Sequence, residues 1–242
     1  MDKNFDILIL AAGNSRRLKS NFSKMLLKIG KYTLIEIAVK LAKKLKPRSI
    51  NILVNKKLIY IEEQFKSCNF FIQKKQLGTG HAVKVFLKKT NKKINKLLVL
   101  YGDTPLIKHK DIMLLKKKSL NSDLTILAFK DNKNKSCGII KKDLKNKIQA
   151  IVEFKNATRK EKKIKLCNSG IMIINKKIFP LISSIKKNHF SNEYYLTEII
   201  ETTIKRKFTV EMVVSSNKIG SKGINDLKTY NKNLRYFKKN YS

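Results

Sequence analysis

One carboxylate in the sequence stands where a purely structural role does not readily explain it. Asp103 follows a continuous aliphatic run at residues 96–100 and a glycine. Mg²⁺ commonly takes one or two protein oxygens and completes its shell with phosphate and water, so one aspartate and one amide oxygen suffice for it. The structural alternative is that Asp103 caps a helix beginning near Lys108 or orders the turn at residues 104–105. We favour the first interpretation and predict a magnesium ligand at Asp103.

A turn of small residues with basic residues after it is the second candidate for chemistry. Ala11, Ala12 and Gly13 follow the first apolar run, and Arg17 and Lys24 come soon after. Small residues let backbone N–H groups approach an anion closely, and the two cations add fixed positive charge. The spacing is neither the dinucleotide fingerprint nor the Walker A loop. The pattern suits a triphosphate, with a solvated basic loop as the alternative.

Further polar residues follow other expected strands. Gln73 begins the stretch "QKKQLGTGHA", Glu153 ends an expected strand at residues 147–153, and Asn168 lies ahead of another. Each of these residues has a structural alternative when it is taken singly. Gln73 could be a surface polar residue, Glu153 a cross-strand partner for a lysine, and Asn168 a residue that forms a turn. His81 reads as a packed or capping histidine, and we expect no acid–base role for it.

The order of apolar segments predicts the elements that position these residues. Alternating strand-like and helix-like segments indicate an α/β fold, with a mostly parallel sheet flanked by helices and an antiparallel extension in the second half. We expect strands at residues 5–10, 49–54, 70–72, 96–100, 124–129, 138–141, 147–153, 170–174 and 208–214. We expect helices at residues 33–45, 57–65, 80–87, 178–185, 196–205 and 225–236. In such sheets ligands gather beyond the carboxyl ends of the strands, so the residues named above should be neighbours.

Composition limits the other classes of function. The 242 residues carry a formal net charge of +38, which by itself suggests a nucleic-acid or membrane-surface partner. The cations are mostly lysines spread through every segment, whereas arginine, the side chain best suited to phosphate and base recognition, is scarce. Three cysteines without C-x-x-C spacing imply neither a zinc site nor a disulfide framework. We expect a cytoplasmic protein with no signal peptide, no membrane partner and no specific nucleic-acid partner.

Taken together and in this order, the motifs resemble a known family. They are "LAAGNSRRLKSNFSK", "QKKQLGTGHAV", "LVLYGDTPLI", "IVEFKNA", "NSGIMI", "NEYYLTEII" and "GIND". They are similar to the uridyltransferase domain of the bifunctional GlmU-type enzymes, the UDP-N-acetylglucosamine pyrophosphorylases of the sugar nucleotidyltransferase family, from residue 5 to about residue 230. The resemblance implies a Rossmann-like fold and a Mg²⁺-dependent reaction in which a sugar 1-phosphate attacks the α-phosphate of UTP and expels pyrophosphate. UTP and N-acetylglucosamine 1-phosphate are the implied partners.

The resemblance also assigns roles residue by residue. Nucleotide contacts are implied for Leu10, Ala11, Ala12, Gly13, Lys24, Gln73, Gly78 and Thr79. Contacts to the sugar and its phosphate are implied for Tyr101, Gly102, Gly138, Glu153, Asn168, Tyr195 and Thr197. Arg17 and Lys24 are the implied catalytic cations, and Asp103 and Asn225 the implied Mg²⁺ ligands. We expect a single domain over residues 1–242, with a nucleotide-binding half at about 1–110 and a sugar-binding half at about 111–242.

The sequence departs from the family pattern at two points. Ser15 and Arg16 stand where the family usually has Gly-Thr, and Ser23 stands for a proline, which leaves the preferred base and sugar open. The family's C-terminal β-helix acetyltransferase domain is not present in residues 1–242, so we predict neither acetyl transfer nor the trimer that it forms, and the oligomeric state stays open. The rival functions are a transferase of the same fold using CTP, another sugar phosphate or an alcohol phosphate, and a catalytically inactive basic protein that binds polyanions.

Overall fold

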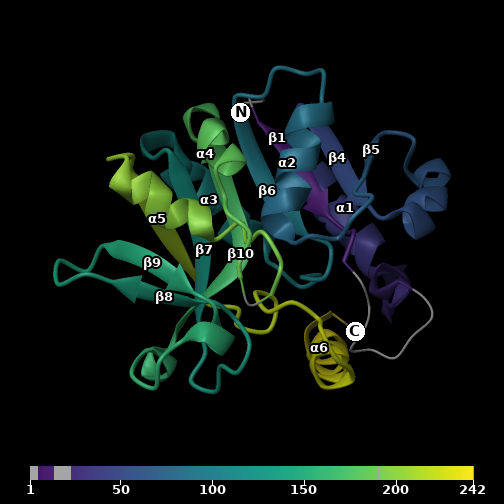
Figure 1. Cartoon of the computed structure of the whole chain (residues 1–242). Helices are drawn as coiled ribbons and strands as arrows, with labels where there is room; N and C mark the ends of the chain where they lie inside the picture. Colours follow the sequence, from purple (N-terminus) through teal and green to yellow (C-terminus); the bar gives the residue numbers. More distant parts are fainter. Residues whose placement is uncertain (1–4, 14–22, 190, 242) are drawn as a thin grey trace.

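The computed structural model describes residues 5–13, 23–189 and 191–241. Within these residues nine strands form one sheet with a central path in the order β11-β7-β10-β6-β1-β4-β5, and the β8–β9 hairpin is attached at β10 (Figure 1). The strands are β1 (Asp6–Leu10), β4 (Ser49–Val54), β5 (Asn69–Ile72), β6 (Lys96–Tyr101), β7 (Leu124–Lys130), β8 (Ile139–Lys142), β9 (Ile148–Val152), β10 (Leu166–Asn175) and β11 (Val210–Ser215). The predicted α/β fold class is confirmed.

Parallel pairing at the centre of the sheet aligns the strand ends. β1 is parallel to both β4 and β6, with Leu10 opposite Leu53 on one side and Tyr101 on the other. β10 is antiparallel to β6 and β7, and it supplies the expected antiparallel extension. Because β10 runs the other way, it is the first half of this strand that lies beside the carboxyl end of β6.

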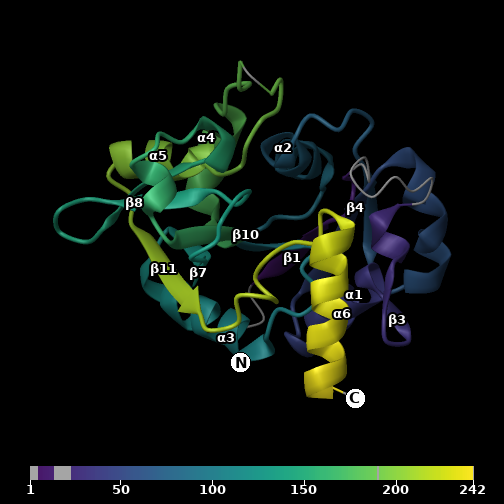
Figure 2. The ribbon, with the colours of Figure 1, turned by 90° about the horizontal axis from the view of Figure 1, so that it is seen from below.

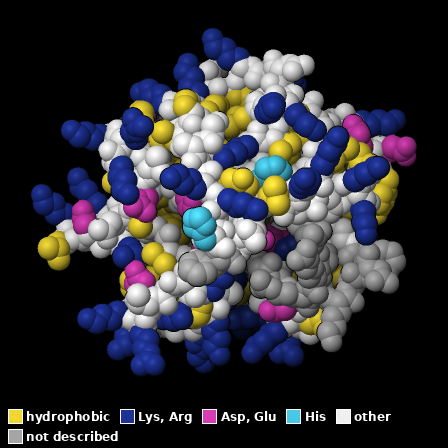
Figure 3. Space-filling view, in the orientation of Figure 1, with side chains coloured by type: hydrophobic (Ala, Val, Ile, Leu, Met, Phe, Trp, Pro, Cys, Tyr) yellow, Lys and Arg dark blue, Asp and Glu magenta, His cyan; other side chains and the backbone are white. Residues whose placement is uncertain are grey.

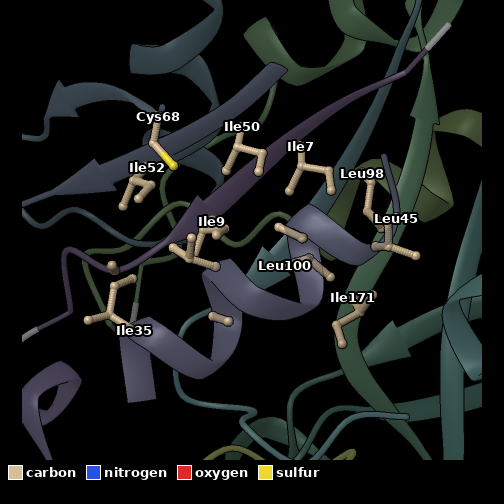
Figure 4. Packing of buried hydrophobic residues seen from close by; sticks show 14 of the residues in the cluster. Ile7, Ile9, Ile35, Leu45, Ile50, Ile52, Cys68, Leu98, Leu100 and Ile171 are labelled. Atoms are coloured by element: carbon tan, nitrogen blue, oxygen red, sulfur yellow. The ribbon is translucent and has the colours of Figure 1, made fainter. Parts of the chain in front are cut away.

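The central strand β1 is covered on both faces. All five of its residues are buried, but Ile7 and Ile9 belong to one apolar cluster while Leu8 and Leu10 belong to another. Side chains alternate between the faces of a strand, so a strand with helices on both faces requires a continuous aliphatic run. Figure 4 shows members of the first cluster between the sheet and the helix that begins at Leu34.

The helices divide between the two faces of the sheet. α1 (Leu34–Lys44) and α3 (His109–Lys118) contribute to the cluster of Ile7 and Ile9, whereas α2 (Thr79–Lys89), α4 (Phe179–Ser183) and α5 (Glu198–Lys205) contribute to that of Leu8 and Leu10. α6 (Leu227–Tyr241) packs on the small hairpin of β2 (Lys28–Ile29) and β3 (Tyr32–Thr33), close to α1 (Figure 2). No helix in the described part of the chain is long and apolar enough to cross a bilayer.

Several boundaries follow from local signals in the sequence. The helix expected at residues 33–45 begins after Thr33, whose hydroxyl accepts from the Glu36 N–H while the Glu36 carboxylate accepts from the Thr33 N–H, a capping box. The segment expected to be helical at residues 57–65 is a 3-10 helix, Lys56–Phe65. The β2–β3 hairpin was not predicted, because two-residue strands are too short to show a periodicity.

A bulge in β10 lies where the first half of this strand passes the carboxyl end of β6. The pairing with β7 shifts register between Asn168 and Met172, and Gly170, inside this interval, has a φ of +89°. A Cβ at residue 170 would lie 2.8 Å from the Tyr101 ring. A side chain at this position would therefore meet both an unfavourable backbone conformation and the ring.

The variant Gly170→Ala should lower the free energy of unfolding by about 2 kcal/mol, since an L residue with positive φ costs roughly 1–2 kcal/mol before any clash is added. Urea denaturation measures this difference. Gly13→Ala is the matched control, because among the described residues the nearest atom to a Cβ at residue 13 is 3.9 Å away, so its unfolding free energy should stay near that of the wild type. Equal stability of the two variants would mean that the bulge does not require glycine.

Candidate active site

A cleft of about 700 Å³ lies at the carboxyl ends of the central strands. Its wall includes residues from both halves of the chain, among them the turn after β1, the start of α2, the end of β6 and the segments at residues 191–197 and 221–225. The predicted site residues that line it are Leu10, Ala12, Gly13, Lys24, Gln73, Gly78, Thr79, Tyr101, Asp103, Gly138, Glu153, Asn168, Tyr195, Thr197 and Asn225. The folded chain thus brings these residues to one cavity.

Two predicted contact residues support the cleft from behind. Ala11 is buried in the apolar core, and its N–H donates to the Leu53 carbonyl at 2.8 Å, so this N–H is used within the sheet. Gly102 donates its N–H to the Leu10 carbonyl at 3.0 Å, and a Cβ there would lie 2.6 Å from the Met25 sulfur. Neither lines the cavity.

Of the two predicted catalytic cations, the structure describes Lys24 and not Arg17. Arg17, like Ser15 and Arg16, lies outside the described residues, so its predicted role stays a prediction. Ser23 lies at the start of a short 3-10 helix, where its hydroxyl accepts from the Met25 N–H at 3.3 Å. The Ser23 hydroxyl therefore closes a local turn, and the next residue, Lys24, lines the cleft.

Lys24 joins three segments that are distant in the sequence. Its ammonium donates to the Asp103 carboxylate, to Asn225 Oδ1 at 3.1 Å and to the Ile224 carbonyl at 3.3 Å. The Lys24 and Asp103 side chains are only 11% and 13% exposed. The Ile224 N–H in turn donates to the Asp103 carbonyl at 2.8 Å, which holds the segment at residues 223–225 against the end of β6.

This arrangement bears on one alternative for Asp103, the capping of a helix that begins near Lys108. The residue at the N-cap of α3 is Lys108, so Asp103 does not cap that helix. Asp103 and Asn225 instead direct a carboxylate and an amide oxygen at one cation, the ammonium of Lys24. One carboxylate and one amide oxygen suit Mg²⁺ when phosphates supply further ligands. No group of three or more His, Cys, Asp or Glu that could hold a metal occurs among the described residues.

The opposite side of the cleft is built from the start of α2 and the segment before α5. Gly78 has a φ of +95°, and a Cβ there would lie 2.6 Å from the Tyr194 carbonyl. The Gly80 N–H donates to the same carbonyl at 2.8 Å, and the Thr79 hydroxyl accepts from the Leu196 N–H at 3.1 Å. No local pattern predicts that residues 194–196 hold this turn, because the contact between Thr79 and Leu196 spans 117 residues.

A partly buried carboxylate faces the cleft from the far half. The Thr197 hydroxyl donates to Glu153 Oε1 at 3.2 Å. Burial raises the pKa of Glu153, and the Thr197 hydrogen bond acts against that shift. Burial also raises the pKa of Tyr101, so its phenol stays protonated. Asn168 Oδ1 is buried without a hydrogen-bond partner among the described residues. This end of the cleft therefore offers acceptors for substrate hydroxyl or amide groups.

Other residues line the cleft that were not predicted. They are Met25, Leu53, Gln76, Leu77, Ala82, Thr104, Ser136, Cys137, Ser169, Gly170, Ser191, Asn192, Glu193, Ser221 and Gly223. Most of them belong to one of the quoted motifs or adjoin a predicted residue in the sequence. Leu53, Ser136, Ser191 and Ser221 do neither, so no signal in the sequence indicated them.

The chain is similar to proteins of known family. A sequence profile of the MobA-like NTP transferase domain matches residues 7–165. Two curated relatives, both named bifunctional protein GlmU, are those of Buchnera aphidicola subsp. Baizongia pistaciae, 37% identical over 92% of the chain, and of Acholeplasma laidlawii, 32% identical over 98%. The chain covers 50% and 52% of these two relatives, so it spans about half of their length.

Solved structures share the fold at lower sequence identity. A protein assigned as a glucose-1-phosphate thymidylyltransferase of Bacillus anthracis, solved with sucrose, has a TM-score of 0.75 at 18% identity and covers 96% of this chain and 94% of its own. A UDP-glucose pyrophosphorylase solved with UDP-glucose has a TM-score of 0.73 at 18% identity and covers 97% of this chain and 98% of its own. At this identity the likeness concerns the fold.

The raised pKa of Glu153 leads to a testable dependence of stability on pH. A raised pKa means that the folded state holds the proton more tightly than the unfolded chain, so stability falls as pH rises from the usual glutamate value of 4.5 through the raised value. Glu153→Gln keeps an oxygen for Thr197 and removes the charge. It should raise the melting temperature at neutral pH, and the gain should shrink below pH 4.5.

Thermal melting over a pH series measures this effect, with Glu63→Gln as the control because Glu63 is exposed. A variant that melts below the wild type at neutral pH would show that the ionised Glu153 stabilises the fold.

Proposed function

The chain belongs to the MobA-like NTP transferase family, and from that premise we propose that it transfers UMP from UTP to N-acetylglucosamine 1-phosphate. An oxygen of the sugar 1-phosphate attacks the α-phosphorus of UTP, the bond from that phosphorus to the oxygen bridging to the β-phosphorus breaks, and pyrophosphate leaves. The observation that carries the proposal is the convergence of Asp103 and Asn225 on one cation in the cleft.

The described residues can support this reaction without a protein nucleophile. Phosphoryl-type transfer depends mainly on positioning the reactants and on stabilising negative charge. Asp103 and Asn225 would hold Mg²⁺, and the bound ion would offset the charge of the triphosphate. Lys24, in contact with both, would then be free to contact phosphate oxygens. Gln73, Gly78 and Thr79 lie along the same wall and would bind the base.

The choice of sugar rests on the far half of the cleft and on the relatives. Glu153, held by Thr197, can accept hydrogen bonds from sugar hydroxyl groups. The relatives named bifunctional protein GlmU support the resemblance that implies UTP and N-acetylglucosamine 1-phosphate as substrates. The nearest rival is a transferase that uses CTP, another sugar phosphate or an alcohol phosphate. Pyrophosphate release measured over a panel of nucleotides and sugar phosphates separates these substrates.

The rival from another class is a basic protein that binds polyanions without catalysis. On the face in Figure 3, Lys and Arg side chains are spread over the whole surface and do not form one stripe. Spread lysines predict weak binding to any nucleic acid with a steep dependence on salt. This distribution favours a small-molecule substrate in the cleft over a dedicated polyanion surface.

The test of the proposed function is release of pyrophosphate from UTP in the presence of N-acetylglucosamine 1-phosphate and Mg²⁺. Asp103→Ala should lower kcat/KM by about 10²-fold or more, as expected when one preorganised charged contact is lost. Asp143→Ala, in the exposed turn of the β8–β9 hairpin, is the matched control and should retain the wild-type rate. Turnover that survives in Asp103→Ala, or that does not need Mg²⁺, would contradict the proposed role of Asp103.

The contacts of Lys24 predict competition between its ammonium and a divalent cation. Lys24→Met removes the positive charge beside Asp103 and Asn225, so the protein without nucleotide should bind Mn²⁺ about tenfold more tightly, a gain of roughly 1.4 kcal/mol. Titration followed by electron paramagnetic resonance measures the affinity. Lys28→Met, at an exposed neighbouring lysine, should leave it unchanged. Weaker Mn²⁺ binding in Lys24→Met would indicate that the Lys24 ammonium holds Asp103 and Asn225 in place for the ion and does not compete with the ion for them.

A further inference from the structure

The side-chain amide of Gln73 is held at one end by two neighbours. Its Nε2 donates to the Gly78 carbonyl at 3.3 Å and lies 2.8 Å from Nδ1 of His81. Gln73 is 3% exposed, yet it lines the cleft. No group among the described residues donates a hydrogen bond to the Gln73 Oε1. The nitrogen end of the amide is therefore used inside the protein, and the oxygen end is left for a ligand.

These two contacts fix the tautomer of His81 as well. A carbonyl oxygen only accepts, so the end of the amide that faces Gly78 must be the NH₂ group. Its second hydrogen then points to His81 Nδ1, which must be the unprotonated nitrogen of a neutral ring. With His81 in this form, a rotation of the amide by 180° would bring Gln73 Oε1 against two acceptors. The Gly78 carbonyl therefore opposes the flipped amide, and His81 opposes it as long as the ring proton stays on Nε2.

The position of His81 is itself supported from the segment before α5. Its ring is stacked on that of Tyr194, with centroids 6.1 Å apart and planes at 30°. The Tyr194 N–H donates to the Leu77 carbonyl, and Lys84 lies over the Tyr194 ring at 4.6 Å while it donates to the Ile185 carbonyl. Burial lowers the pKa of His81, and the charge of Lys84 acts in the same direction. Both effects keep the ring neutral at neutral pH.

From this geometry we infer that His81 is a positioning residue that sets base selectivity by holding the Gln73 amide with its oxygen toward the base. The inference rests on the proposed function, in which Gln73 contacts the pyrimidine. Uracil has an N3–H donor that matches an amide oxygen, whereas cytosine has a lone pair at N3 that an amide oxygen repels. The class selected is therefore a pyrimidine with an imide N–H, and the class rejected is cytosine.

The variant His81→Leu removes the acceptor and leaves only the longer contact to Gly78, so the amide can present either end. The ratio of kcat/KM for UTP to that for CTP, and the ratio of their affinities by calorimetry, should each fall by about tenfold, the equivalent of one hydrogen bond. His81→Asn can offer an oxygen near the position of Nδ1 and should restore most of the ratio. His109→Leu, at an exposed histidine that begins α3, should not change it.

A double-mutant cycle tests whether His81 acts through Gln73. In a Gln73→Leu background the further change His81→Leu should not alter the UTP to CTP ratio, since there is no amide left to orient. Equal losses for UTP and CTP in His81→Leu, with the ratio unchanged, would mean that the histidine only packs the wall and would overturn the inference. So would an additional drop of the ratio in the double variant.

The two proposals fail in different ways. If the wild type binds UTP in preference to CTP but releases no pyrophosphate with any sugar phosphate, the proposed function is wrong, and the affinity ratios still decide the role of His81. If the wild type turns over UTP and His81→Leu keeps the full preference, the proposed function survives and the positioning role is wrong.

Discussion

The parallel register of β1 between β4 and β6 is the constraint on which the rest of the site depends. With Leu10 opposite both Leu53 and Tyr101, three strands end at the same level, and the chain leaves each of them on the same edge of the sheet. A shift by one residue would turn every side chain of β1 to the other face, so the two apolar clusters fix this register. The turn at Gly13 and the carboxylate of Asp103 lie on one cleft as a consequence of core packing.

The antiparallel strand β10 adds the second half of the chain to this edge. Met172 pairs with Val99, and the preceding bulge brings Asn168 and Gly170 beside the end of β6. If β10 were parallel, its far end would lie at this edge instead. The reversal therefore lets one cleft combine Lys24 and Asp103 on one side with Glu153 and Thr197 on the other.

The sequence could predict most elements of the fold, with α3 and the β2–β3 hairpin missing from the prediction, but only part of their contacts. The run at residues 96–100 and the helix after Thr33 depend on local periodicity and capping, and both were found close to the expected bounds. The contact of Lys24 with Asn225, 201 residues away, depends on tertiary packing that no local pattern reports. The same holds for the Ala11 N–H, which was expected near an anion and is bonded within the sheet. Likewise His81 was expected to pack or to cap the helix, and its hydrogen bond to Gln73 depends on the folded turn.

The central claim is that the cleft holds a metal-bound nucleoside triphosphate between the turn at Gly13 and the carboxylate of Asp103. The most direct measurement is a crystal structure with Mn²⁺ and a non-hydrolysable UTP analogue, in which anomalous scattering locates the ion. The account predicts an Mn²⁺ peak bound by Asp103, Asn225 and a phosphate oxygen, with the Lys24 ammonium withdrawn from Asp103 and the pyrimidine beside Gln73. An analogue bound elsewhere, or a cleft in which Lys24 stays paired with Asp103 and no Mn²⁺ is found at saturating concentration, would contradict it.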